Sequence, residues 1–536
     1  MNNNYKFLII LICCITLISC KKELEEANIN PNNPEHVDPE YLLNTSVLNT
    51  MNLFGGNMRR ETLSHYSNYV SVGGGQMQRY YTFASAVNGY WSALYVSCLQ
   101  PVHQIQLNYA ADPGYKNRVA IAKIFESYIF SNMVAIWGSI PKTKALNGDA
   151  YTAYDKEEDI YKGLLKDLKE AANAIDLNGD TYVGKADAVF GGDLLKWKKF
   201  ANTLRLRLAI QIANASPTSA QEVISEVLAN ESTTITAAGE TAKAYWNTTS
   251  DTWSYLYDYN VLKAAANASS LNVISEALIQ YMLPYNDPRL PIYAKPAPQG
   301  PYKGKYWGQP KATQLPAGVS IPGGNPHSPL GQLDYAQIGD YFTKPDAEYV
   351  FLSYEESCFL KAEAALKGWG GSKTAEQYYR DGITASMSKY NIPQQGISDY
   401  LEQPGIKWNT VVDTIGRAAE FEDYIGITSS AITKPDPYRQ LITQTWLAGF
   451  YNAMDAWTLI RRSQVLEFAP HFNPDGGEGG TVGYAYIPQR LNYPGIEFQV
   501  NTSEINKAIP WLGGADALKT KLWFALPVKK NPFLPQ

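Results

Sequence analysis

The sequence predicts a mainly α-helical protein in which helical hairpins form a scaffold and a loop-rich face covers it. Two observations carry this prediction. Apolar residues recur three and four positions apart through the first half of the chain and again after residue 353. Between these regions, residues 240–350 are rich in Pro, Gly, Tyr and Trp, a composition that forms long ordered loops and not one regular element.

Three amphipathic helices are predicted in the first half. The first covers residues 117–137 and ends at Gly138 and Pro141. The second covers 155–175 and opens on Asp155 and Glu158, which have the spacing of a capping box. The third begins at Asp193 as its N-cap. Its apolar stripe is Trp197, Ala201, Leu204, Leu208 and Ile212, and the residues expected to project away from the stripe are Lys196, Lys199 and Arg207.

A helical pair is predicted over residues 353–390. Ser353 with Glu356 should cap the first helix, which stops at Gly368, and Thr374 with Gln377 should cap the second. Short hairpins of this kind are the units of tetratricopeptide-like scaffolds. Helix is expected to return from about Tyr438 before an irregular C-terminal end.

The first residues have the pattern of a bacterial lipoprotein signal peptide. The apolar run Phe7–Ile18 follows Lys6 and is too short to span a bilayer, which needs about 20 apolar residues. Leu17, Ser19 and Cys20 then fit a lipobox, so residues 1–19 would be removed and Cys20 lipidated. Several acyl chains hold a protein on a membrane far more firmly than one does. An ordinary secretory signal that happens to contain Cys is the alternative.

The predicted order along the chain is therefore a signal peptide at 1–19, a solvated tether at 20–40 and one large unit at 41–536. No charged or Ser/Gly-rich linker divides that unit, and the segment 240–350 is its loop-rich insertion. No segment after the signal is expected to cross a membrane. The acidic stretch Glu23–Glu26 after Cys20 resembles the export signal of lipoproteins that face the cell exterior, and this resemblance implies an outer-membrane location.

Charge and cysteine content exclude several classes. The mature chain would have 45 Lys and Arg against 51 Asp and Glu, a balance that does not favour nucleic acid or anionic lipid as a partner. Cys98 and Cys358 lie in apolar helical patterns, which favours buried free thiols over a disulfide.

Four passages resemble the SusD/RagB family of Bacteroidetes outer-membrane lipoproteins, in the order in which that family has them. They are IWGSIPKTKAL at 136–146, KWKKFANTLRLRLAIQI at 196–212, FLSYEESCFLKAEAALKGW at 351–369 and YIPQRLNYPGIEFQVN at 486–501. The resemblance implies a tetratricopeptide-like scaffold with a loop-rich ligand face. It also implies a partner, a SusC-like TonB-dependent transporter over which the protein docks as a lid, and a glycan or peptide ligand taken up as a nutrient.

The family passages themselves have core spacing. Trp197, Phe200 and Ala201 are expected to pack inside, and Arg461 and Arg462 of the LIRRS stretch are expected to form ion pairs or cap carbonyls.

The sequence offers little for catalysis, metal binding or a cofactor. The five His have no zinc-binding spacing, and there is no Gly-x-Ser-x-Gly nucleophile elbow. Asp176, Asn178, Asp180 and Asp187 have the spacing of a Ca²⁺ loop, but Thr181 replaces the Gly and Asp187 the twelfth-position Glu, so we interpret them as a turn. We therefore expect no enzyme, no catalytic residue, no metal and no cofactor.

Aromatic and planar polar side chains in loops are instead suited to carbohydrate, because a sugar ring packs on an aromatic plane while its hydroxyls need hydrogen-bond partners. Two segments supply such residues. The candidates in the Gly-rich segment 73–91 are Gln76, Arg79, Tyr80 and Tyr81, and those in the insertion are Trp253, Tyr255, Tyr306 and Trp307, with Trp246, Tyr257 and Tyr302 beside them. Packing competes with binding at each ring, and Trp91 is expected to be core.

Three functions of different classes remain open. The favoured one is a carbohydrate-binding lipoprotein that delivers its ligand to the transporter, with a peptide-binding lid as the variant. A surface glycoside hydrolase would need two facing carboxylates about 5–9.5 Å apart. A helical scaffold that binds only proteins would lack clustered aromatic rings outside the core.

Overall fold

The computed structural model describes residues 37–72, 82–149, 151–249, 252–264, 271–309, 331–410, 434–450, 452–468, 471–473, 483–485 and 487–527. The predicted signal peptide, Cys20 and most of the predicted tether lie outside these residues. The chain is mainly helical, as predicted.

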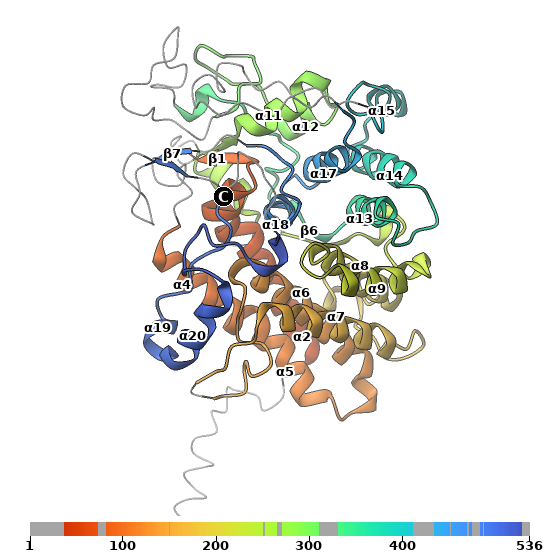
Figure 1. Cartoon of the computed structure of the whole chain (residues 1–536), viewed down its shortest axis with the longest axis vertical. Helices are drawn as coiled ribbons and strands as arrows, with labels where there is room; N and C mark the ends of the chain where they lie inside the picture. The colour runs from red at the N-terminus through yellow and green to blue at the C-terminus, as the bar shows by residue number, and fades with distance from the viewer. Residues whose placement is uncertain are drawn as a thin grey trace, which may run out of the picture.

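Helical hairpins stack along one side of the molecule (Figure 1). α6 packs on both α5 and α7, α8 packs on α7 and α9, and α13 lies along α14. The bounds of this stack are α2 Pro39–Asn52, α5 Gln100–Tyr109, α6 Lys116–Trp137, α7 Glu157–Ala174, α8 Leu194–Gln211, α9 Pro217–Leu228, α13 Tyr354–Leu366 and α14 Ala375–Ser388. The predicted helices at 117–137, 155–175, 193–212 and 353–390 are thus confirmed to within two residues at each predicted start.

The central helix of the stack is α6. Together with the turn before it, Pro113–Trp137 is long and apolar enough to cross a membrane, which the sequence analysis does not expect of any segment after the signal. However, 83% of its most apolar stretch is buried inside the protein. Phe125, Ile129 and Ile136 are almost fully buried, so α6 is the core helix of the scaffold.

The helix starts show which sequence signals decide a cap. Asp193, Ser353 and Thr374 accept hydrogen bonds from the backbone three residues ahead, as predicted, and Thr374 with Gln377 forms the full capping box. The predicted cap at Asp155 is wrong. The Asp155 carboxylate instead accepts hydrogen bonds from the backbone N–H groups of Lys142 and Thr143, and α7 begins two residues later.

The polar face predicted for α8 is also partly wrong. Lys199 and Arg207 are buried, each at 8% exposure, although both were expected to project away from the apolar stripe. Lys199 pairs with Glu240, and Arg207 pairs with Glu356 and Asp455 from two other helices. α8 is therefore enclosed on nearly every side, and its charged residues are neutralised inside the fold.

A short antiparallel sheet in the order β1-β3-β5-β4 lies at the opposite end of the molecule from α2 and α5 (Figure 1). Val70 pairs with Ile274 and Val72 with Asn272, so β1 joins the early chain to the insertion. A second pair, β2 with β6, connects the insertion to the stack. The strands are β1 Val70–Val72, β2 Ala242–Tyr245, β3 Asn272–Ile274, β4 Ala294–Lys295, β5 Gln337–Ile338 and β6 Glu348–Leu352.

Short helices and helical turns make up much of the remaining chain before α13. The early ones are η1 Leu53–Asn57, η2 Arg59–Leu63, α3 Ser64–Tyr66, α4 Ala84–Ser92, η4 Ala93–Leu99, η5 Pro113–Tyr115, η6 Gly184–Ala186, η7 Glu231–Thr233 and η8 Ala238–Glu240. Those of the insertion are α10 Tyr255–Tyr257, η9 Asp258–Leu262, α11 Glu276–Met282, η11 Leu283–Tyr285, α12 Leu290–Tyr293 and η12 Gln332–Asp334. The insertion thus consists of short elements joined by loops, as its composition predicts.

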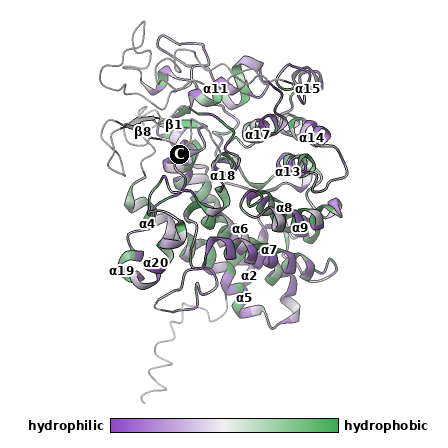
Figure 2. Ribbon diagram, viewed as in Figure 1, coloured by the Kyte–Doolittle hydropathy of each residue, from purple (hydrophilic) through white to green (hydrophobic). Residues whose placement is uncertain are grey.

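The C-terminal part closes the core. α18 contacts α3, α8 and α17, so chain segments far apart in sequence meet there. The remaining elements are α15 Gln394–Leu401, α17 Pro437–Ala448, α18 Ala453–Ser463, β7 His471–Asn473, β8 Gly483–Ala485, α19 Glu497–Val500, α20 Thr502–Ala508, η13 Ile509–Leu512 and η14 Trp523–Ala525. Apolar segments gather along the interior of the stack and polar ones along its outside (Figure 2).

Predictions for single buried residues are confirmed. Trp91, Trp197 and Phe200 lie in the core, and Cys98 and Cys358 are buried free thiols. Arg461 donates to the carbonyl groups of Ala135 and Gln489, and Arg462 pairs with Glu363.

Candidate ligand-binding site

Two segments of the insertion that hold candidate rings reach strand β3. Leu271, Val273 and Tyr335 form a small buried cluster there, separate from the main core. Trp307 packs against this cluster from one segment and Ala264 from another. The chain before Ala264 is fixed to the same strand, because the Asn260 amide donates to the Asn272 carbonyl at 2.8 Å. The segments that contain Asn260, Ala264 and Trp307 therefore lie side by side at β3.

Tyr302 lies flat on Trp307. Their ring centroids are 4.1 Å apart and the rings are inclined by only 11°, a stacked geometry. Trp307 packs on the buried cluster around Val273, and both rings are half-buried. The two rings therefore support each other beside this cluster. The predicted residue Trp307 is in this stack, and Tyr302 beside it supplies the second plane.

Tyr306 has a different environment. Its half-buried ring packs against the main hydrophobic core, and burial raises the pKa of its hydroxyl above the usual value. Its neighbour Trp307 packs on the separate cluster at β3. The two adjacent rings thus reach different clusters.

The second aromatic group surrounds an arginine that sequence reasoning missed. Tyr255 stacks on Tyr259 with ring centroids 4.3 Å apart and an angle of 21°. The Arg60 guanidinium lies 4.0 Å from the centroid of the Tyr259 ring and donates to the Tyr255 hydroxyl at 3.3 Å. The Lys263 ammonium lies 4.2 Å from the same ring centroid. Two cations therefore contact the negative face of one tyrosine.

Trp253 stands next to this group and meets Tyr257 edge to face, at a centroid distance of 5.7 Å. We call the half-buried rings of Trp253, Tyr255, Tyr257, Tyr259, Tyr302 and Trp307 the aromatic site. All six come from the predicted insertion.

Trp246, considered as a further candidate, belongs to the core. It is 6% exposed, and its indole N–H donates to the Asn52 side chain at 2.9 Å. A Cβ atom at Gly55 would lie 2.6 Å from the indole ring, so glycine is required for this close approach. A single tryptophan in a loop-rich sequence does not reveal a packing partner that lies almost 200 positions earlier.

The candidates Gln76, Arg79, Tyr80 and Tyr81 lie outside the described residues. The described chain nearest to them is β1, whose last residue Val72 pairs with Asn272 of β3. β3 also holds part of the small cluster on which Trp307 packs.

Arg60 and Tyr259 are the site residues that sequence reasoning missed. Arg60 is in a helical turn that follows Gly55 and Gly56. Gly55 was the available signal, because its backbone approaches Trp246 of the insertion too closely for a Cβ atom.

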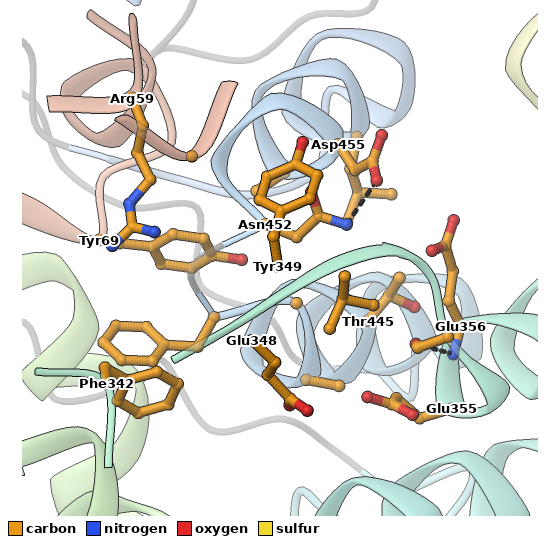
Figure 3. A pocket seen from close by; sticks show the side chains of 18 of the residues that line it. Arg59, Tyr69, Phe342, Glu348, Tyr349, Glu355, Glu356, Thr445, Asn452 and Asp455 are labelled. Atoms are coloured by element: carbon orange, nitrogen blue, oxygen red, sulfur yellow. Dashed lines mark hydrogen bonds between the residues drawn. The ribbon is translucent and has the colours of Figure 1, made fainter. Parts of the chain in front are cut away.

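A cavity of about 120 Å³ adjoins Tyr255 of the aromatic site, and Figure 3 shows part of its lining. Tyr255 and Leu256 line it from the site, while β6 and α18 line it from the scaffold. Arg59, Glu348, Glu355, Glu356 and Asp455 supply its charged wall in the view of Figure 3. A cluster of carboxylates in a cavity is the arrangement that a glycosidase would need, so their partners decide its chemistry.

Glu356 and Asp455 are occupied by one guanidinium. Arg207 donates to both oxygens of Glu356, each at 2.6 Å, and contacts the Asp455 carboxylate at 3.2 Å. Burial raises the pKa of both carboxyls, and Arg207 opposes that rise. This geometry describes a buried ion network that links α8, α13 and α18.

The Ca²⁺-like sequence forms a turn, as interpreted. Asp176 accepts from the Asn178 backbone, and Asp180 pairs with Arg118. Asp187 accepts from three backbone N–H groups and from the Trp197 indole. Each carboxylate thus has a protein partner. Within the described ranges, no group of three His, Cys, Asp or Glu side chains is placed to hold a metal ion.

Comparison with known proteins gives one family. The family model described as starch-binding and associating with the outer membrane, the SusD-like family, matches residues 31–494. No curated protein sequence matches the chain.

Several solved structures share the fold. A chitin-binding SusD homologue from Flavobacterium johnsoniae is 22% identical, with a TM-score of 0.71, and the alignment covers 91% of this chain and 98% of that one. A SusD homologue from Bacteroides vulgatus is 21% identical, with a TM-score of 0.72 and coverage of 90% and 97%. A protein named as chitin-binding is 23% identical, with a TM-score of 0.70 and coverage of 91% and 100%.

Proposed function

The chain belongs to the SusD-like family, described as starch-binding and associating with the outer membrane, and on that premise we propose that it captures oligosaccharides at the cell surface. The aromatic site is the proposed ligand-binding surface. Its rings lie on loops, as binding residues commonly do, and they are held by a small cluster separate from the main core.

The Tyr302–Trp307 stack is the observation that carries this proposal. A sugar ring needs a flat apolar face, and Trp307 supports Tyr302 from beneath at 4.1 Å, so that plane is fixed before a ligand arrives. The second stack, Tyr255 on Tyr259, is held by Arg60 in the same way. Two pre-arranged planes suit an oligomer better than a single sugar.

Polar groups beside the rings supply the hydrogen bonds. Asp258 and Lys263 are paired at 2.6 Å next to Tyr259, and Lys263 is half exposed. Lys303 and Lys305 are exposed beside Tyr302. Hydroxyl groups of a sugar accept from ammonium groups and donate to carboxylates, so both kinds of partner are present.

The protein is proposed to bind without catalysis. Glu356 and Asp455, the acidic pair that a surface glycoside hydrolase would most resemble, are held by Arg207. A carboxylate engaged by a guanidinium on both oxygens cannot serve as a general acid for a glycosidic bond. The family description likewise names binding and not hydrolysis.

The proposed location follows from the N-terminal sequence. Cys20 would carry the acyl chains, residues 21–40 would be the tether, and residues 41–536 would form the ligand-binding unit outside the cell. A binding protein without a channel needs a transporter to move its ligand inward. A SusC-like TonB-dependent barrel is the partner that the family resemblance implies.

A peptide-binding lid is the other form of this function. Extended peptides commonly bind by adding a strand to an exposed sheet edge. β1 is the edge strand of the sheet beside the site, but Val70 and Ser71 are buried at 1% and 0% exposure. The described edge is therefore covered, and the stacked rings favour carbohydrate.

Titration calorimetry tests this proposal with two oligosaccharide series. N-acetylglucosamine oligomers represent the ligand of the chitin-binding relatives, and malto-oligosaccharides represent the family description. We expect one series to bind with an affinity that increases with length, because two stacks can be occupied by a longer oligomer. Binding of unstructured peptides in preference to both series would favour the peptide-binding form.

A further inference from the structure

The outer side of α2 presents apolar side chains to solvent. Tyr41 and Leu48 are 73% and 44% exposed, and their spacing of seven positions places them on one side of a helix with 3.6 residues per turn. Thr45, which lies between them on that side, is also exposed. Leu43 and Val47 point the opposite way and are fully buried. The helix therefore has a second apolar side that the fold leaves uncovered.

Hydrogen bonds identify the segments on either side of the exposed residues of α2. The Asn49 amide donates to a backbone carbonyl of η4 at 2.9 Å, and Val96 of η4 is 66% exposed. The Asn44 amide donates to the Lys185 carbonyl of η6 at 2.7 Å, and Val183, directly before η6, is 79% exposed. Helical spacing places Asn49 and Asn44 on the two sides of Tyr41 and Leu48. The exposed apolar surface thus continues from α2 onto both neighbouring segments.

We call the exposed side chains of Tyr41, Leu48, Val96 and Val183 the α2 face. A single exposed apolar side chain is ordinary. Several that adjoin one another and are bordered by polar groups, here the amides of Asn44 and Asn49, mark an interaction surface. The α2 face is therefore a docking surface, and the position of the lipid anchor indicates what docks there.

The predicted tether joins the fold at this surface. The described chain begins at Val37, two residues before α2, and the Val37 carbonyl accepts from the Tyr109 hydroxyl of α5 at 3.3 Å. Cys20, the predicted lipidation site, precedes Val37 by 17 residues. A chain of that length spans at most about 60 Å when fully extended. As a flexible coil it spans about 20–25 Å. The anchor therefore holds the α2 face towards the membrane.

A protein embedded in that membrane suits the α2 face better than the lipid itself. Helices that lie on a bilayer surface usually have Lys and Arg on their polar side. Neither α2 nor η4 contains a Lys or an Arg. The acyl chains on Cys20 would also attach the protein to lipid without any help from α2. The apolar side chains therefore remain available for a protein partner.

We propose that the α2 face docks on the extracellular end of a membrane-embedded transporter barrel. The proposal rests on the proposed function, which supplies the partner, and it adds the surface that the partner contacts. The sheet that contains β3 lies at the opposite end of the molecule from α2 (Figure 1). Docking through α2 therefore leaves the aromatic site accessible to oligosaccharide while the protein stays attached.

Photo-crosslinking tests the contact in cells that make the full lipidated protein and its transporter. Benzoylphenylalanine replaces Leu48 or Val96 in the α2 face. It replaces Leu366 as the matched control, because Leu366 is 37% exposed on α13, away from α2 (Figure 1). We expect adducts with a TonB-dependent barrel, identified by mass spectrometry, from the two α2-face positions and not from Leu366.

A charged variant tests whether the face is needed. Leu48→Glu combined with Val96→Glu should lower the amount of barrel that co-purifies in detergent at least tenfold, because docking would bury two carboxylates. Leu366→Glu should leave the recovery unchanged. Both variants should keep the wild-type Tm and the wild-type affinity for oligosaccharide, since the substituted side chains are exposed and lie outside the aromatic site.

Other adducts would overturn the proposal. Crosslinks from Leu48 and Val96 to lipid, to residues 21–36 of the same chain or to a second copy would assign the face to that occupant instead. Wild-type recovery of the barrel by a folded Leu48→Glu/Val96→Glu variant would also overturn it.

Failure of this proposal differs from failure of oligosaccharide capture. A wild-type protein that binds oligosaccharide but forms no barrel adduct would refute the docking and leave capture standing. A protein that forms the adduct from the α2 face but binds no oligosaccharide would refute capture and leave the docking standing.

Discussion

Tyr302 and Trp307 form a stacked pair at 4.1 Å in which Trp307 packs on Val273 and its neighbours. The two rings therefore have different roles. Trp307 fixes the loop by packing on the cluster at β3, and Tyr302 provides a flat ring that its stacking on Trp307 keeps in place. The Tyr302 side chain has already lost conformational entropy on folding. Stacking of a ligand on it therefore requires little further ordering of the protein.

Substitution should separate these two tasks. Tyr302→Ala should weaken oligosaccharide binding by about 0.5–1.5 kcal/mol, roughly two- to tenfold, and change stability little. Trp307→Ala should lower the free energy of unfolding by roughly 3 kcal/mol as well, because it leaves a space at the β3 cluster. Calorimetry and urea unfolding measure the two effects.

Tyr41→Ala is the matched control, since Tyr41 is 73% exposed on α2, far from β3. It should alter neither quantity. Equal destabilisation by Tyr302→Ala and Trp307→Ala would show that both rings are structural, and the binding surface would then lie elsewhere.

The buried network at Arg207 predicts a large loss of stability. Arg207→Met should lower the free energy of unfolding by about 3–5 kcal/mol, because Glu356 and Asp455 would remain buried without their guanidinium. Denaturant unfolding measures the change. Lys196→Met, on the same helix but partly exposed, should stay within about 0.5 kcal/mol of wild type. A small effect of Arg207→Met would show that the two acids are solvated.

Glu157 predicts a pH dependence of stability. Its buried carboxylate accepts from the backbone N–H groups of Trp523 and Phe524, and burial raises its pKa to about 7 despite these bonds. The ordinary value is 4.5, so the folded protein binds the proton more tightly than the unfolded chain. The contribution of Glu157 to stability is therefore full below the lower pKa and declines as the pH rises to about 7.

Glu157→Gln should remove that decline. Relative to wild type, the variant should gain on the order of 1–3 kcal/mol between about pH 4.5 and pH 7.5, measured by urea unfolding at each pH. Glu157→Gln also removes one acceptor for a backbone N–H, which lowers the variant's stability by the same amount at every pH. The slope of the unfolding free energy against pH therefore reports the titration of Glu157 alone. A parallel pH profile for both proteins would contradict the raised pKa.

The N-terminal sequence predicts lipid attachment at a single residue. Cys20→Ala should abolish incorporation of a fatty-acid probe, because the acceptor thiol after Ser19 is lost. Metabolic labelling and membrane fractionation measure this. Cys98→Ala is the control, since that thiol is buried in the fold and should not affect labelling. Label retained in Cys20→Ala would refute the lipobox interpretation.

Local patterns in the sequence predict the helical stack well, since each helix is set by its own apolar spacing and its own cap. The predictions are wrong where a contact with a distant segment determines the burial or the hydrogen bonding of a residue. Lys199 and Arg207 are buried because Glu240, Glu356 and Asp455 reach them from other elements. The Asp155 carboxylate accepts hydrogen bonds from the backbone N–H groups of Lys142 and Thr143 and therefore does not cap the helix that follows it.

The aromatic site shows the same limit. Loop composition alone indicates that residues 253–257 and 302–307 hold rings of interest, and of these rings Trp307 packs on the cluster at β3. Which rings pack on the cluster and which stack on another ring depends on contacts between segments that are far apart in the sequence. The stacking of Tyr302 on Trp307 could therefore not be predicted from residue spacing. Arg60 enters from a segment almost 200 positions earlier, which explains why it was missed.

The most direct test of the central claim is a calorimetric titration of the wild-type protein and a Tyr255→Ala/Tyr302→Ala variant with the oligosaccharide series that binds, followed by analysis of the sugar recovered. Losing both planes should weaken binding by about 1–3 kcal/mol, roughly five- to 150-fold, at unchanged thermal stability, and the oligosaccharide should be recovered intact. Wild-type affinity in the double variant, or shortened oligosaccharide after incubation, would contradict a non-catalytic capture site on the aromatic face.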